Sequence, residues 1–206
     1  MKKSIFKAGK KYTFSDYFEL NSPTEEIVAE LGYAFSYEVI HLPRSNDYSI
    51  DEINKLQQTL YTILPKIIIN SEIAKREFLI APILVEIAKN TASKINVEYA
   101  LEVDDRLSGS LDYLIQLKQE IIVIEAKKGD LDKGFNQLSA ELIALDKYED
   151  DNTSNVLYGA ISIGDVWKFG ILKRQEKQIS KDINSYTIPA DIEKVFSILM
   201  GILTKT

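Results

Sequence analysis

The stretch from Ser110 to Lys127 reads SLDYLIQLKQEIIVIEAK, two apolar runs separated by a short polar break. Asp112 lies in the first run, and Glu125 and Lys127 lie in the second. Buried strands rarely carry charged residues unless the charges are paired or bind a metal. Carboxylates and a lysine within such strands therefore suggest a divalent metal site with a positioned base or electrophile.

The two apolar runs predict a β-hairpin around a turn at Lys118-Gln119. In a symmetric antiparallel register, Asp112 and Glu125 lie equally far from the turn and face each other. Opposite Cβ atoms are ~5 Å apart, so the two carboxylates can share one cation. Lys127 follows Glu125 by two positions in the sequence and therefore points to the same face of the strand.

An alternative interpretation places Glu125 and Lys127 as an exposed pair on an edge strand and Asp112 as a surface acid. The apolar run that precedes Glu125 favours a central, buried strand instead.

Composition restricts the kind of site. The chain of 206 residues suits a single domain over 1–206, and 45% of its residues are apolar. It has no cysteine and one histidine, His41, so disulfides, zinc–thiolate sites and cysteine nucleophiles are excluded, and multi-histidine zinc sites and Ser-His-Asp hydrolases are disfavoured. A metal site must then be rich in oxygen ligands, which favours Mg²⁺, Mn²⁺ or Ca²⁺.

The charge and the apolar runs bear on partners and location. A net charge of −6 argues against indiscriminate coating of nucleic acid, although it leaves room for a local basic patch. No apolar run is long enough for a signal peptide or a membrane span. We therefore expect a cytoplasmic protein without a membrane partner.

Hydrophobic periodicity and capping signals predict the elements of the first half of the chain. Pro82 is expected to kink or break the last of the helices. These elements are a helix from Ser22 to about Gly32, a strand over 33–41, a helix over 49–65, a helix over 71–90, a strand over 95–103 and a turn over 104–109.

The second half continues with the hairpin and then alternates helices and strands. Gly129 and Gly134 bracket a predicted loop, and a Gly164-Asp165 turn joins two further strands. The elements after the hairpin are a helix over 135–148, strands over 156–163 and 166–172, and a closing helix over 188–203. This order predicts an α/β fold with a mixed central β-sheet flanked by helices.

Asp112 followed by Glu125-Ala126-Lys127 resembles the Asp…(Asp/Glu)-x-Lys motif of the PD-(D/E)xK nuclease superfamily, which has the restriction-endonuclease-like fold. Leu111 stands where the superfamily often has proline. The stretch from Ser71 to Leu84, SEIAKREFLIAPIL, resembles a helix of the nuclease module in type I restriction motor subunits. The resemblance covers about residues 70–172 and also includes a late Gly-Asp turn with Trp-x-Phe.

The resemblance implies a set of site residues. Glu72 matches the helix glutamate that completes the metal site, and Arg76 matches its basic companion. Gln137 matches a glutamine of the helix after the motif, although Glu141 replaces the tyrosine of the Gln-x-x-x-Tyr pattern. The implied catalytic residues are Glu72, Asp112, Glu125, Lys127 and Gln137, and the implied metal ligands are Glu72, Asp112, Glu125 and the carbonyl of Ala126.

Structural interpretations of the flanking residues remain open. Glu72 follows a predicted helix cap, where acids are favoured in any case. Arg76 can be a surface salt-bridge partner, and Gln137 can bridge backbone groups. Trp167 and His41 suit a core and a strand position better than a base-contacting role. Lys128 and Lys133 can contact phosphate or be solvated charges.

The sequence thus predicts an Mg²⁺- or Mn²⁺-dependent nuclease that hydrolyses phosphodiester bonds, with DNA the expected substrate and a homodimer possible. Residues 70–172 form the expected nuclease-like core, 1–69 an N-terminal extension of helices and a strand, and 173–206 a C-terminal strand and helix. The alternative is a catalytically inactive binding or regulatory protein on the same fold, because a fold does not carry its function with it.

Overall fold

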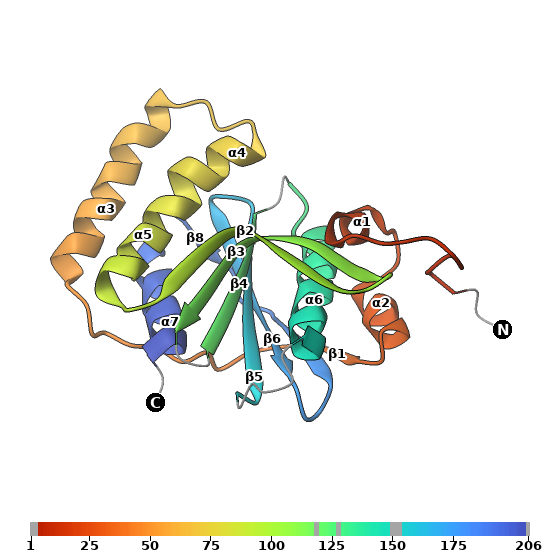
Figure 1. The fold of residues 1–206 in the computed structure, drawn as a ribbon. Helices are drawn as coiled ribbons and strands as arrows, with labels where there is room; N and C mark the ends of the chain where they lie inside the picture. Colours follow the sequence, from red (N-terminus) through yellow and green to blue (C-terminus); the bar gives the residue numbers. More distant parts are fainter. Residues whose placement is uncertain (1–3, 118–119, 127–128, 149–153, 205–206) are drawn as a thin grey trace.

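The computed structural model describes residues 4–117, 120–126, 129–148 and 154–204, and of 120–126 it describes the main chain. In these ranges eight strands form one sheet in the order β1-β7-β6-β5-β4-β3-β2, with β8 paired to β6 (Figure 1). The strands are β1 (Ala34–Glu38), β2 (Lys94–Asp104), β3 (Leu107–Leu117), β4 (Glu120–Ala126), β5 (Val156–Ser162), β6 (Val166–Lys173), β7 (Gln178–Asp182) and β8 (Tyr186–Thr187).

Helices cover both faces of this sheet. In Figure 1, α3, α4, α5 and α7 lie on one face, and α1, α2 and α6 lie on the other. The sheet is mixed because β1 pairs with β7 and β4 with β5 in parallel, whereas the other neighbours are antiparallel. The predicted α/β fold with a mixed sheet is therefore confirmed.

The helices are α1 (Phe14–Glu19), α2 (Thr24–Glu30), α3 (Ile50–Ile63), α4 (Glu72–Lys75), α5 (Ala81–Asn90), α6 (Leu131–Tyr148) and α7 (Ile192–Thr204), with short turns η1 (Leu64–Lys66) and η2 (Arg76–Ile80). None of the described helices has the length and apolar character needed to cross a membrane.

The predicted hairpin register is confirmed. The turn at Lys118-Gln119 lies outside the described residues, but the strands on either side pair from Leu117 opposite Glu120 to Tyr113 opposite Ile124. β4 also pairs with β5 on its other side, so it is a central strand, as its apolar run indicates.

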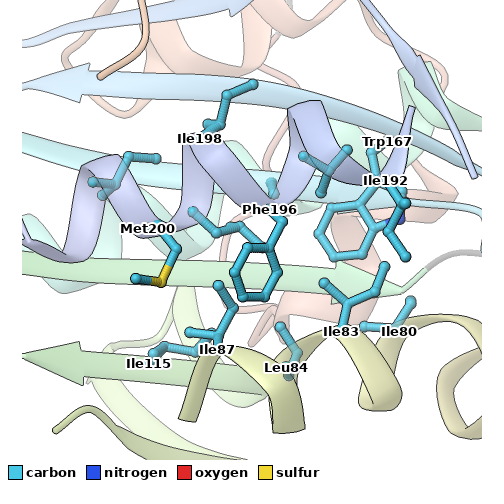
Figure 2. Close-up of a cluster of buried hydrophobic side chains, with 14 of the residues drawn as sticks. Ile80, Ile83, Leu84, Ile87, Ile115, Trp167, Ile192, Phe196, Ile198 and Met200 are labelled. Carbon is cyan, nitrogen blue, oxygen red and sulfur yellow. The ribbon is translucent and has the colours of Figure 1, made fainter. Parts of the chain in front are cut away.

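Two apolar cores fill the space between the helices and the sheet. The α5–α7 core packs side chains of α3, α5 and α7 against the sheet, and Figure 2 shows Trp167, Phe196 and Ile83 within it. Trp167 is fully buried, which confirms its predicted core position. The α6 core lies on the opposite face and contains residues of α1, α2 and α6.

Helix α6 is buried on all sides between Gly134 and Leu145, because α1 and α2 cover the side that faces away from the sheet. The helix begins at Leu131 rather than at the predicted Phe135, and Gly134 lies inside it. The physical reason is Asp130, whose Oδ1 accepts hydrogen bonds from the main-chain N–H groups of Asp132 and Lys133 and so caps the helix one turn earlier.

Pro82 acts as expected on the helix over 71–90. Ser71 caps α4 by accepting a hydrogen bond from the Ala74 N–H, and α5 begins at Ala81. Between them η2 is a π-helical turn in which the Ala81 N–H bonds to the Arg76 carbonyl. Pro82 has no N–H and its ring crowds the carbonyl four residues earlier, that of Phe78, which accounts for the wider turn.

Several elements differ from the predicted ones. Helix α1 and strand β8 were not predicted, whereas the strand expected within 173–206 is β7. The strand expected over 33–41 is β1, which ends at Glu38 and leaves His41 exposed beyond it. The turn expected over 104–109 is shorter, because the Asp104 carboxylate accepts hydrogen bonds from the N–H groups of Arg106 and Leu107 and β3 begins at once. The closing helix begins at Ile192 rather than at Ile188.

Gly109 brings α1 against the β2–β3 hairpin. Its φ is +142°, and a Cβ atom there would lie 2.9 Å from Cδ2 of Phe14 and 3.2 Å from the Phe14 main-chain nitrogen. Only glycine permits both this conformation and this approach.

We expect Gly109→Ala to lower the free energy of unfolding by more than the matched change Gly32→Ala. Gly32 has a φ of +91° with no atom within 4 Å of its Cβ position, so its substitution costs only conformational strain, about 1–2 kcal/mol. Gly109→Ala adds roughly 1–3 kcal/mol from crowding against Phe14. Urea unfolding of both variants measures the difference, and equal losses would contradict the close packing of α1.

Candidate functional site

Asp112 lies in a row of acidic positions that crosses adjacent strands. The β2–β3 register sets Val97 opposite Tyr113 and Tyr99 opposite Leu111, so Glu98 lies opposite Asp112. The β3–β4 register continued by one position sets Glu125 on the other side of Asp112. The main chain thus aligns Glu98, Asp112 and Glu125 across three neighbouring strands, as the sequence predicted for the last two.

Arg76 reaches this row from the first residue of η2. Its Nη1 lies 2.7 Å from Oε1 of Glu98 and 3.5 Å from Oδ1 of Asp112. Its guanidinium carbon lies 5.2 Å from the centre of the Tyr113 ring. The Asp112 side chain is 14% exposed and that of Arg76 is 19% exposed, so this is a partly buried ion pair rather than a surface one.

The environment keeps Arg76 charged. Partial burial lowers the pKa of the guanidinium, but the hydrogen bond to Glu98 and the neighbouring Tyr113 and Asp112 outweigh it and raise the pKa above its ordinary value. The basic companion implied by the resemblance therefore lies at the Asp112 carboxylate and is not a solvated surface cation.

Glu98 has an unusual backbone conformation within β2. It has a φ of +54° inside a strand, a conformation that non-glycine residues rarely adopt. Before it, Ile95 contacts the α5–α7 core, and after it, Leu101 is part of the α6 core, although both lie at odd-numbered positions. On β3, Tyr113 and Leu111 divide between the two cores in the same way. Odd-numbered residues of β2 therefore face one core before Glu98 and the other core after it, and those of β3 change core in the same way at Asp112.

Helix α4 and η2 are held over the ends of β5 and β6. Gly164, in the turn between these strands, has a φ of +100°, and a Cβ atom there would lie 2.9 Å from Cδ1 of Leu79 and 3.1 Å from Cβ of Lys75. This close approach fixes the helical segment that carries Arg76 at the edge where β4 and β5 end.

Glu72 lies one helical turn before Arg76, in the first turn of α4, and is half-buried. Among the described side chains no hydrogen bond or ion pair joins it to Asp112. Its position also fits the ordinary preference for acids after a helix cap, so the structure places Glu72 on α4 without bringing it into contact with Asp112.

Gln137 lies inside the molecule. It is 3% exposed, and its Nε2 donates a 2.9 Å hydrogen bond to Oε1 of Glu141, which is fully buried on the same helix. Oε1 of Gln137 has no hydrogen-bond partner among the described residues. The side-chain amide of Gln137 thus binds Glu141 within the same helix.

The side chains of three residues of the predicted site lie outside the described part of the structure. Glu125 and Ala126 are described through their main chain, which pairs with Ile161 and Ser162 of β5. Lys127 lies outside the described residues, as does Lys128. Within the part of the chain whose side chains are described, no three acidic or histidine residues form a group that could hold a metal ion.

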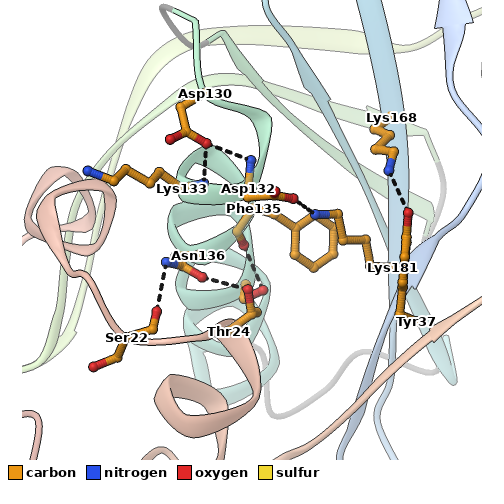
Figure 3. Close-up of polar contacts among 11 residues, drawn as sticks. Ser22, Thr24, Tyr37, Asp130, Asp132, Lys133, Phe135, Asn136, Lys168 and Lys181 are labelled. Atoms are coloured by element: carbon orange, nitrogen blue, oxygen red, sulfur yellow. Dashed lines mark hydrogen bonds and ion pairs between the residues drawn. The ribbon is translucent and has the colours of Figure 1, made fainter.

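Sequence reasoning missed Glu98, and it considered Lys133 without its neighbours. Figure 3 shows Lys133 at the start of α6, with Lys181, Lys168 and Tyr37 grouped on the strands beside it. The C-terminal strand was predicted within 173–206 without bounds or partners, so no pattern in the sequence brought Lys181 beside Tyr37 and Lys168. Hairpin arithmetic does not find Glu98, because the β2–β3 register shifts by one position between Glu102 and Asp104, and mirror pairing about the turn would set Glu98 opposite Tyr113.

A scan against protein-family models found no match to this chain, and searches of curated proteins and of solved structures found none either.

We expect Glu98→Gly to be more stable than Glu98→Ala by about 0.5–1 kcal/mol, the reverse of the usual order in a strand. Both changes remove the carboxylate that binds Arg76, and only glycine relieves the left-handed conformation. Urea unfolding of the two variants tests this, and an alanine variant at least as stable as the glycine variant would show that Glu98 is not strained.

Proposed function

We propose that this protein is a metal-dependent nuclease that hydrolyses phosphodiester bonds, with DNA as the expected substrate. The observation that carries the proposal is the main-chain register of two central strands, which pairs Tyr113 with Ile124 and, when continued by one position, sets Asp112 opposite Glu125. Two opposite carboxylates repel each other unless a cation lies between or beside them, so their alignment favours a cation-binding role.

The ligands available fit Mg²⁺ or Mn²⁺. The side chains of the row that could bind a metal are carboxylates, which offer oxygen atoms. The chain has no cysteine, and its one histidine, His41, is exposed beyond β1. Asp112, Glu125, the Ala126 carbonyl and Glu72 would hold the ion, which is the restriction-endonuclease-like arrangement. Such an ion lowers the pKa of bound water and stabilises charge on a phosphate.

The remaining groups of the chain have distinct proposed tasks. Lys127 orients or deprotonates the attacking water, or neutralises charge in the transition state. If a cation bound the Asp112 carboxylate, Arg76 would still form its 2.7 Å ion pair with Glu98. The guanidinium would therefore remain a fixed positive group beside the site. Gln137 holds Glu141 within α6 and supports the helix that follows the motif strand.

We expect Asp112→Asn and Lys127→Ala to lower Mg²⁺-dependent cleavage of DNA by about 10²–10⁴-fold. The matched control is Asp105→Asn, whose side chain is 74% exposed in the β2–β3 turn and should leave the rate unchanged. Cleavage of single-stranded, duplex and plasmid DNA measures the rates. Activity that survives both site substitutions would exclude this assignment.

The second candidate function is a catalytically inactive binding or regulatory protein of the same architecture. The ion pair between Arg76 and Asp112 favours it, because a guanidinium already compensates this carboxylate without a metal. The two functions differ in whether the acidic row binds a divalent ion at all.

Calorimetric titration with Mn²⁺ discriminates between these functions. A nuclease is expected to bind the ion and to lose that binding in the Glu125→Gln variant. The inactive protein is expected to show no heat of binding in either form. Binding that persists unchanged in Glu125→Gln would place the ion elsewhere and contradict the proposed ligands.

A further inference from the structure

The acidic row continues across the sheet to a lysine. Glu125 pairs with Ile161 of β5, and Ile161 pairs with Lys168 of β6. Lys168 therefore occupies the same row as Asp112, three strands away. Neighbouring strands are ~4.8 Å apart, which separates the two positions by about 14 Å. A strand of a few nucleotides is long enough to join the two positions, although Ile161 between them is fully buried and offers no surface for contact.

Two further residues continue this arrangement on the outer strands. Lys181 of β7 pairs with Gly170 of β6, which lies two positions after Lys168, and Tyr37 of β1 pairs with Lys181. The Lys168 Nζ donates a 3.1 Å hydrogen bond to the Tyr37 hydroxyl and lies 5.0 Å from the centre of its ring. The Lys181 Nζ lies 5.7 Å from the same ring centre.

Tyr37 is an exposed aromatic side chain between two ammonium groups. It is 55% exposed, although it lies in a strand of the sheet. Figure 3 shows its ring standing beside Lys181, with Lys168 above it. An aromatic face flanked by cations is the arrangement that proteins use to stack an unpaired base and to bind the adjoining phosphates.

A cleft of about 570 Å³ adjoins this aromatic side chain. It lies between the start of α6, the segment before α2 and the strands β1 and β7, and Lys133 and Tyr37 are among its lining residues. The cleft also contains Glu25 and Asp132. The hydrogen bond from Lys181 lowers the pKa of the Asp132 carboxyl, so these two residues form a compensated ion pair. Lys133 in the lining of the cleft, and Lys168 beside the cleft at the Tyr37 hydroxyl, remain as the cations available to a phosphate.

We propose that this cleft binds single-stranded nucleic acid, with a base stacked on Tyr37 and phosphates contacted by Lys168 and Lys133. The inference rests on the proposed function in one respect, since the bound strand extends from the acidic row. A single strand is the ligand because only an unpaired base offers its face to an aromatic ring. Stacking does not distinguish DNA from RNA, so both are probes.

The test is a fluorescence anisotropy titration of the full chain with labelled oligothymidylate and oligouridylate, in EDTA to prevent cleavage. We expect Tyr37→Ala to weaken binding by roughly five- to 150-fold without changing the salt dependence. Lys168→Gln should weaken binding and reduce the slope of log K against log salt by about 0.7, the value for one phosphate contact on a single strand.

Matched variants separate binding from folding. Tyr61→Ala removes a similarly exposed tyrosine (47%) from α3 on the opposite face, and Lys55→Gln removes an exposed lysine from the same helix. Both should bind as the unmodified chain does. Tyr37→Phe keeps the ring, and Lys168→Arg keeps the charge, so both should restore most of the affinity.

Each outcome decides the proposal. Affinities of Tyr37→Ala and Lys168→Gln equal to those of Tyr61→Ala and Lys55→Gln would overturn it, and so would the absence of binding to either oligonucleotide. A chain that binds through Tyr37 but never cleaves would refute the proposed function and leave this inference standing. A chain that cleaves normally in both cleft variants, with unchanged affinity, would refute this inference alone.

Discussion

The main-chain pairing of β3 with β4 determines where the charged groups of the candidate site lie. Its register runs from Leu117 opposite Glu120 to Tyr113 opposite Ile124, and continuing it by one position sets Asp112 opposite Glu125. A shift of one residue would move one of these side chains to the opposite face. The β2–β3 register extends the same row to Glu98 on one side, and the β4–β5 and β5–β6 registers extend it to Lys168 on the other.

The row needs compensation for its negative charge, and the helical segment over 71–90 supplies it. Pro82 prevents a regular helix, and the π-helical turn that results begins with Arg76. Gly164 lets this segment approach the ends of β5 and β6, and Arg76 then contacts both Glu98 and Asp112. The unusual conformation of Glu98 occurs at the same place, where the hairpin turns from one core to the other. Strained residues and π-helical turns both concentrate at functional sites, which supports a functional interpretation of this edge.

Much of this arrangement follows from local patterns in the sequence. Periodicity predicted the hairpin, α3, the broken helix at Pro82 and the core position of Trp167, because each depends on neighbours close in the chain. A C-terminal strand was expected within 173–206, but its bounds and its partners could not be predicted, since Gln178 to Asp182 is a short, polar segment that pairs with the distant strands β1 and β6. This pairing places Lys181 beside Tyr37, and the group that they form with Lys168 was therefore missed, whereas Lys133 was considered from the sequence. Arg76 was proposed from a resemblance, whereas its partner Glu98 required a second register that the alternating pattern of β2 did not reveal.

The relative placement of Asp112 and Glu125 is the central claim, and disulfide trapping tests it most directly. The chain has no cysteine, so Asp112→Cys combined with Glu125→Cys introduces the only two thiols. Opposite residues have Cα atoms ~4.5–5.5 Å apart, within the range that a disulfide spans. Mild oxidation followed by titration of free thiols should show an intramolecular disulfide in this variant and none in the shifted pair Asp112→Cys with Ile124→Cys. A disulfide in the shifted pair, with free thiols in the first, would contradict the account.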